Sequence, residues 1–148
     1  MIEVKDLTKR FGATLAVDGL NFSVKAGEVL GFLGPNGAGK TTTMRLLTGF
    51  FPPSAGTARI AGHDVVEEPL AARRAVGYLP ENVPLYVDMR VREYLDFVGA
   101  AKGLDRLAAR REGQRVMEAT GIGARAGQLI KQLSKGYRQR VGLAQALL

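Results

Sequence analysis

Gly34 to Thr41, with the sequence GPNGAGKT, is the part of this chain best suited to chemistry. The run fits the pattern G-x-x-x-x-G-K-[ST], which is typical of a phosphate-binding loop. Its glycines allow backbone N–H groups to curl around phosphate oxygens. Lys40 adds a full positive charge for the outer phosphates, and the Thr41 hydroxyl is suited to ligating Mg²⁺. The run therefore predicts binding of nucleotide phosphates.

A phosphate-binding loop needs a strand before it and a helix after it. Glu28–Leu33 is short and mostly apolar, so we expect a strand buried on both faces. Thr42–Leu47 has apolar residues three and four apart, so we expect a helix that stops near Gly49. Such a helix points its positive end, about half an elementary charge, at the loop. The alternative is a glycine-rich turn between a strand and a helix that binds nothing.

The N-terminal half also contains signals for other strands. Ile2–Leu7 and Ala16–Val24 alternate apolar and polar residues, which predicts a small antiparallel sheet leading into the central strand. Gly56–Ala61 predicts a further strand, and Ala75–Leu79 predicts one that ends at Pro80. Pro69–Arg74 suits a short helix, because proline is allowed in the first turn.

The character of the sequence becomes helical from Arg90 onward. A first helix is indicated by the apolar stripe Val91, Tyr94, Leu95 and Val98. A second, more basic helix is expected from about Leu104, and a third after Ser134 with the stripe Val141, Ala144 and Leu148. The third helix has no C-terminal stop signal and ends on an apolar Ala-Leu-Leu, so we expect that the chain was cut there.

Four further residues are candidates for a functional role. Phe11 offers an aromatic face to an adenine ring, although it could equally be a core or turn phenylalanine. Glu81 follows a predicted strand end, where sheet proteins place functional groups. Ser134 and Gly136 open a helix with a free hydroxyl and bare N–H groups, which is either an anion site or simply a capped helix. His63, the only histidine, is expected to be a surface residue in a turn.

Composition and charge restrict the classes of protein to which this chain could belong. Hydrophobic residues make up 46% of the 148 residues, which is enough for a core, and the absence of cysteine excludes disulfides and thiolate metal sites. The charged N-terminal residues predict no signal peptide, and no apolar run is long enough to cross a membrane. The net charge of +7 includes a group of arginines interleaved with acids, which favours a solvated helix face over a nucleic-acid contact. Those arginines are Arg106, Arg110, Arg111 and Arg115.

Taken together, these motifs resemble the nucleotide-binding subunit of ATP-binding-cassette (ABC) transporters, in order and over all 148 residues. Phe11 matches the adenine-stacking aromatic, and Gly34–Thr41 matches the Walker A loop. Gly77–Glu81 matches the strand leading to the loop named for glutamine, and Leu133–Tyr137 matches the signature usually written LSGGQ. The Glu81-Asn82 pair and the LSKGY signature look most like bacterial exporters of the multidrug, antibiotic or gliding-motility subgroup.

The resemblance implies an α/β fold. We expect an incomplete P-loop NTPase core with an N-terminal antiparallel β subdomain and a C-terminal α-helical subdomain that carries the signature. Within the single ATP-binding domain of residues 1–148, residues 1–84 would hold the β subdomain and the Walker A core, and residues 85–148 the helical subdomain.

The cofactors implied by the resemblance are ATP and Mg²⁺. Thr41 and Glu81 would contact the metal. The nucleotide would be bound by Phe11, Gly34, Asn36, Gly37, Gly39, Lys40, Thr41, Thr42, Ser134 and Gly136.

The sequence departs from the family pattern in three places. Glu81 stands where glutamine is usual, and Lys135 and Tyr137 replace a glycine and a glutamine of the signature. The 148 residues also stop before the family's Walker B aspartate, catalytic glutamate and switch histidine. The complete protein is thus expected to be an ABC-type ATPase, whereas these residues alone are expected to bind nucleotide weakly at best and not hydrolyse it. No residue here is assigned a certain catalytic role.

The resemblance also implies partners. Two nucleotide-binding subunits would face each other head to tail and close on ATP, driving export through transmembrane permease subunits at the inner, cytoplasmic face of the cell membrane. We expect no nucleic acid as a partner. The alternative is a non-transport ABC ATPase that acts on nucleic acid or the ribosome through the basic helix. A nucleotide kinase or GTPase is disfavoured, because no Asn-Lys-x-Asp run is present.

Overall fold

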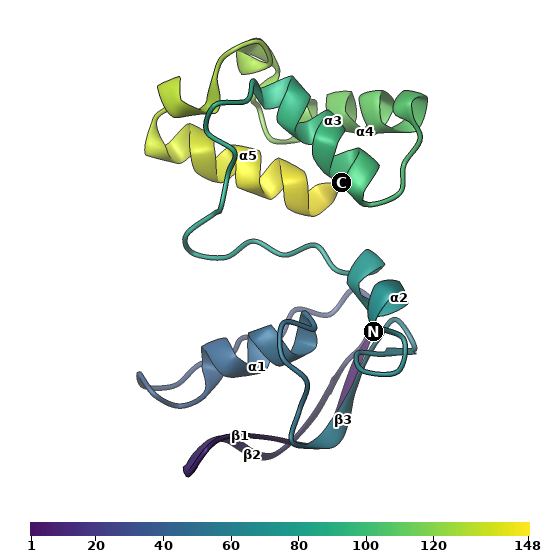
Figure 1. Cartoon of the computed structure of the whole chain (residues 1–148), viewed down its shortest axis with the longest axis vertical. Coiled ribbons are helices and arrows are strands. Elements are labelled where there is room, and N and C mark those ends of the chain that lie inside the picture. Colours follow the sequence, from purple (N-terminus) through teal and green to yellow (C-terminus); the bar gives the residue numbers. More distant parts are fainter. The chain divides into compact units, whose positions relative to one another are not determined.

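An antiparallel sheet forms near the N-terminus, as its alternating pattern predicts. The computed structural model, drawn in Figure 1, describes all 148 residues. Its sheet has the strand order β2-β1-β3-β4. The strands are β1 (Ile2–Phe11), β2 (Thr14–Val24), β3 (Ala55–Ile60) and the two-residue β4 (His63–Asp64). Each neighbouring pair is antiparallel, and the pairing of Phe11 with Thr14 leaves a two-residue turn between β1 and β2.

Two helices complete the first of two compact units, which spans Met1–Val76. They are α1 (Lys40–Leu47) and α2 (Pro69–Arg74), both close to their predicted positions. Gly49, just beyond α1, has a φ of +68°, as expected for a glycine that follows a helix. The core of this unit consists of Val4, Leu7, Val17, Leu46, Leu47, Ala58, Ile60, Val65 and Ala72. One apolar face of the sheet is therefore buried against α1 and α2.

The predicted central strand does not form. Glu28–Leu33 has no regular secondary structure, and the side chains of Val29 and Leu33 are 95% and 94% exposed. Only Phe32 packs, with its ring centroid 5.6 Å from that of Phe22. A strand buried on both faces needs hydrogen-bonded neighbours and two layers of cover. No strand of this chain pairs with Glu28–Leu33, so its apolar composition alone does not make it a strand.

The prediction for Ala75–Leu79 is wrong for the same reason. This segment is irregular, and Tyr78 and Leu79 are 39% and 41% exposed. Both incorrect predictions concern segments that find no strand partner among the residues of this chain. The strands that do form are all joined in one antiparallel ladder.

The second unit, Gly77–Leu148, is helical. Its helices are α3 (Val91–Ala101), α4 (Arg106–Ala119) and α5 (Lys135–Leu147), with 3-10 turns at Gly123–Arg125 and Ile130–Gln132. All the predicted stripe residues of α3 and α5 are buried or half-buried in one core. The core residues are Val91, Tyr94, Leu95, Val116, Met117, Ile122, Ala126, Ile130, Leu133, Val141 and Ala144. No helix of the chain is both long and apolar enough to span a lipid bilayer.

Candidate functional site

The segment from Gly34 to Lys40 is curled. The Ala38 N–H donates to the Pro35 carbonyl at 3.3 Å, and Gly37 and Gly39 have φ values of +86° and +81°. These left-handed conformations are costly for residues with a side chain but not for glycine. The prediction that the glycines allow the backbone to turn here is confirmed.

Helix α1 begins directly after this turn, with Gly39 as its N-cap. The first helical hydrogen bond runs from the Thr43 N–H to the Gly39 carbonyl at 2.8 Å. The N–H groups of Lys40, Thr41 and Thr42 therefore have no acceptor within the helix. No side chain caps this end, and no acidic residue lies in the first turn. The start of α1 thus presents free donors and the positive end of the helix dipole to an anion.

Lys40 folds back over the turn. Its Nζ donates to the Gly34 carbonyl at 2.6 Å and to the Pro35 carbonyl at 2.7 Å. The ammonium group is therefore held at the turn from which α1 starts. A phosphate oxygen would compete with these two carbonyls for the ammonium protons.

Thr41 and Thr43 differ in exposure and in role. Thr43 is 2% exposed, and its Oγ1 donates to the Gly39 carbonyl at 3.0 Å, which fixes the turn to the helix. Thr41 is exposed on the first turn. No three His, Cys, Asp or Glu side chains converge to hold a metal ion. Mg²⁺ needs no such cage, because it keeps several waters and takes few protein ligands beside phosphate oxygens. The exposed Thr41 hydroxyl fits that requirement.

Phe11 is the last residue of β1 and is 44% exposed. Its ring lies nearly perpendicular to that of Phe51, with centroids 5.4 Å apart. It is therefore not a core residue, and it borders the turn formed by Gly12 and Ala13. A ring that is anchored at one edge and still open to solvent could receive a planar ligand.

Glu81 lies in the loop that leads toward α3 and is exposed. Its backbone carbonyl accepts a hydrogen bond from the Gln139 Nε2 on α5 at 3.0 Å. Together they border a hollow of about 460 Å³ lined by Glu81, Asn82, Val83, Pro84, Leu85, Val87, Lys135, Arg138 and Gln139. The structure thus joins the Glu81 loop to the helix that begins at Ser134.

Ser134 caps α5, as predicted, and its Oγ accepts from the Tyr137 N–H. The bond is long, 3.4 Å, and both Ser134 and Gly136 are exposed. A Cβ built on Gly136 would meet no atom within 4 Å, so its backbone is open to a ligand. The hydroxyl of Ser134 is therefore only weakly engaged by the protein itself.

A comparison of two helix caps tests this interpretation of Ser134. The Asp105 Oδ1 caps α4 with a shorter bond of 2.8 Å from the Ala108 N–H. We expect Asp105→Ala to lower the free energy of unfolding by about 1 kcal/mol, and Ser134→Ala to lower it by about 0.5 kcal/mol. Urea unfolding of the two variants and the wild type measures the difference. A larger loss for Ser134→Ala would mean that the serine is chiefly a structural cap.

The basic face of α4 is partly neutralised by neighbouring acids. The Arg115 Nε lies 2.6 Å from a carboxylate oxygen of Glu112, and the Arg111 Nε lies 3.6 Å from the other. The hydrogen bond from Arg115 holds the pKa of the Glu112 carboxyl below its usual value. This pairing favours a solvated helix face.

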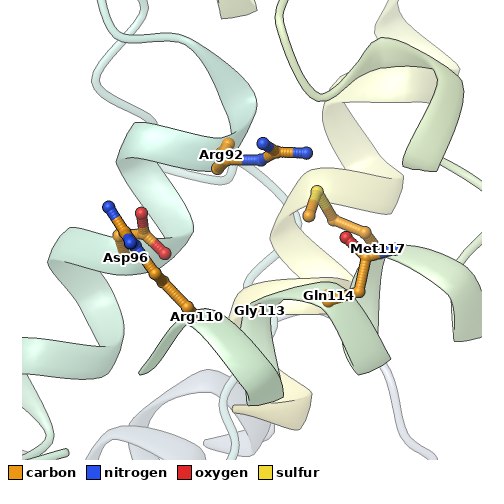
Figure 2. A pocket seen from close by; sticks show the side chains of 6 residues that line it. All are labelled: Arg92, Asp96, Arg110, Gly113, Gln114 and Met117. Carbon is orange, nitrogen blue, oxygen red and sulfur yellow. The ribbon is translucent and has the colours of Figure 1, made fainter. Parts of the chain in front are cut away.

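A hollow of about 410 Å³ lies between α3 and α4. Its lining combines two arginines with a carboxylate and an amide, and its full set is Arg92, Asp96, Arg110, Gly113, Gln114 and Met117 (Figure 2). Because Asp96 lies among these cations, the hollow is poorly suited to a chain of phosphates.

His63 is partly exposed and pairs with Glu68, as a surface histidine would. It does not lie in a turn as predicted, because it pairs with Ile60 of β3 and so belongs to the short strand β4. The two groups lie 3.0 Å apart, and this hydrogen bond lowers the pKa of the Glu68 carboxyl. Nothing in the structure gives His63 a catalytic setting.

Three further residues support the candidate site and were not predicted from the sequence. Thr43 and Gln139 anchor the turn at Gly39 and the loop at Glu81 through hydrogen bonds. Phe51 packs on Phe11. The adjacent aromatic residues Phe50 and Phe51, followed by two prolines, are a feature of the sequence that could have drawn attention to Phe51. No local sequence feature indicates the role of Gln139.

Comparison with known proteins agrees with this geometry. The sequence profile of the ABC transporter family matches residues 17–148. All 148 residues of the chain align with the "Probable multidrug ABC transporter ATP-binding protein YbhF" of Escherichia coli at 39% identity, and the alignment covers 26% of that protein. The chain also aligns over 99% of its length with the "Daunorubicin/doxorubicin resistance ATP-binding protein DrrA" of Streptomyces peucetius. The identity is 37%, and the alignment covers 44% of that protein.

The fold also matches a solved structure. An "ATP binding subunit of ABC transporter" superposes with a TM-score of 0.87 at 30% identity, covering 99% of this chain and 62% of that one. The chain spans less than two thirds of each of these relatives. Because the family profile covers nearly all of the sequence, the chain belongs to the ABC transporter family.

Proposed function

We propose that this chain supplies the ATP-binding residues of an ABC exporter subunit. The observation that supports this most strongly is the start of α1, where free N–H groups and the Lys40 ammonium converge on one turn. The names of YbhF and DrrA, which refer to multidrug transport and drug resistance, support the exporter assignment.

In this proposal Gly34, Asn36, Gly37, Gly39, Lys40, Thr41 and Thr42 hold the phosphates of ATP. Thr41 ligates Mg²⁺, and Phe11 stacks on the adenine. Mg²⁺ would shield the charge of the phosphates when bound, while the chain itself orients them through backbone donors and Lys40. Glu81 contributes to the metal or its water and acts as a sensor at the interface with the membrane subunits.

Ser134 and Gly136 would contact the γ-phosphate held by a second copy. Their exposure at the start of α5 supports this, because a residue that acts in trans must be accessible. The partners are then a second nucleotide-binding subunit, arranged head to tail, and transmembrane permease subunits at the inner face of the membrane. We also propose functional subdomains of residues 1–84 and 85–148.

Equilibrium binding distinguishes this proposal from a nucleic-acid function. We expect the chain to bind MgATP, and to bind a single-stranded RNA oligonucleotide only at low salt, because the basic face of α4 is interleaved with acids. Titration of each ligand at two salt concentrations, followed by fluorescence, gives the answer. Salt-resistant RNA binding without MgATP binding would favour the alternative of a non-transport ABC ATPase.

We further propose that these 148 residues do not hydrolyse ATP at an ordinary enzymatic rate. Phosphoryl transfer needs a positioned water and stabilisation of the developing charge, and the residues of the proposed site supply only the second of these. We expect steady-state phosphate release well below about 1 s⁻¹ per chain. A coupled phosphate assay with the Lys40→Ala variant as background measures it, and release near that rate would overturn the proposal.

A further inference from the structure

Phe11 belongs to a small cluster with Phe51 and Lys9. The Phe11 and Phe51 rings have centroids 5.4 Å apart and planes inclined at 76°. The Lys9 Nζ lies 5.2 Å from the centroid of Phe11 and 5.7 Å from that of Phe51. The same ammonium donates to the Pro52 carbonyl at 2.6 Å. Two side chains therefore restrain the orientation of the Phe11 ring.

The backbone fixes the two rings relative to each other. The Ser54 N–H donates to the Thr8 carbonyl at 2.8 Å, and the Arg10 N–H donates to the Ser54 Oγ at 3.0 Å. These bonds tie the segment after Phe51 to the end of β1. Phe51 itself is half-buried against the core of the first unit, which gives it a rigid base.

Phe50 provides an internal contrast. It is 70% exposed and packs on Phe51, with centroids 4.8 Å apart, but it does not pack on Phe11. The two adjacent phenylalanines thus have different surroundings. Only Phe51 is placed to control the ring of Phe11.

We propose that Phe51 is a positioning residue for the nucleotide base, acting by holding the Phe11 ring in place with the help of Lys9. This inference depends on the proposed function, in which Phe11 stacks on adenine. A ring at the end of a strand would otherwise sample several orientations, and fixing it in advance reduces the entropy lost on binding. The effect is limited to the base and does not extend to the phosphates.

The expected effect is moderate and specific. An edge-to-face aromatic pair contributes about 0.5–1.5 kcal/mol, which corresponds to about 2- to 10-fold in a dissociation constant. We expect Phe51→Leu to weaken binding of MgATP by about that factor. Binding of magnesium tripolyphosphate, which has no base, should be unchanged. Phe51→Tyr, which keeps the ring, should bind MgATP as the wild type does.

The experiment measures both ligands by calorimetric titration of the wild type, Phe51→Leu, Phe51→Tyr and the control Phe50→Leu. Phe50→Leu should leave both affinities unchanged. A loss of affinity in Phe51→Leu for both ligands alike would show a merely structural role, and no loss for either would show no role; each overturns the proposal. Should Phe51→Leu fail to fold, Lys9→Met replaces it, with a smaller loss expected for MgATP alone.

The same titrations separate this inference from the function on which it depends. If the wild type binds neither ligand, the proposed nucleotide site fails. If the wild type binds tripolyphosphate as tightly as MgATP, the phosphate site stands, but Phe11 does not engage the base and the role of Phe51 fails with it.

Discussion

Lys40→Ala is expected to weaken binding of MgATP by about 10- to 100-fold, because each charge-assisted hydrogen bond to a phosphate contributes about 1.5–3 kcal/mol. The ammonium of Lys40 already lies over the turn, where it donates to the carbonyls of Gly34 and Pro35. Part of its interaction with phosphate is offset by the loss of these two bonds. The net effect should nevertheless remain large, because both carbonyls can be hydrated once the lysine moves.

The matched control is Lys25→Ala, which removes an exposed lysine of the same unit outside the turn. We expect it to bind MgATP as the wild type does. Lys40→Ala should also bind tripolyphosphate more weakly than the wild type does. The factor should be the same as for MgATP, since the lysine contacts only phosphates. Equal affinities of wild type and Lys40→Ala for MgATP would remove the basis of the proposed site.

Gly39→Ala is expected to lower the free energy of unfolding of the first unit by about 2–5 kcal/mol, the sum of about 1–2 for a left-handed residue and about 1–3 for overpacking. Gly39 has a φ of +81°, and a Cβ there would lie 2.4 Å from the Ala16 carbonyl oxygen and 3.3 Å from the Val17 side chain. The turn would have to move away from β2. MgATP affinity should fall as well, because the donors at the start of α1 are placed by this contact.

Comparing Gly39→Ala with Gly37→Ala isolates the contribution of the steric clash, because only Gly39→Ala creates one. Gly37 has a similar φ of +86°, but a Cβ there would meet nothing within 4 Å. Without nucleotide, its free energy of unfolding should fall only by the left-handed penalty of about 1–2 kcal/mol. Urea unfolding of both variants measures the difference, and equal losses would mean that the approach of Gly39 to Ala16 places no constraint on the turn.

Local signals predicted much of the candidate site. The curl at Gly37 and Gly39, the start of α1, the proline-led helix α2 and the serine cap of α5 all follow from residue types within a few positions. Each depends on φ preferences or on hydrogen bonds to nearby N–H groups, which act over short stretches of chain. The resemblance to ABC transporters rested on Phe11, Gly34–Thr41, Gly77–Glu81 and Leu133–Tyr137, and the family match bears it out.

Strand predictions were less reliable, because a strand is stabilised by partners. Ile2–Phe11 and Thr14–Val24 pair across a two-residue turn, so their pattern was sufficient. Glu28–Leu33 is at least as apolar but pairs with no strand, and its Val29 and Leu33 lie in solvent. Periodicity describes which faces a strand could bury and does not supply its neighbours.

The sequence by itself determined the chemistry proposed for this protein, since the glycines, Lys40 and Thr41 of the turn before α1 are contiguous and their backbone geometry is local. Only the tertiary structure decided what supports that chemistry. It placed Ala16 against Gly39, Phe51 against Phe11 and Gln139 against Glu81, and each of these pairs is far apart in sequence. Such contacts arise when separate segments share one core or one sheet, and no pattern within a single segment encodes them.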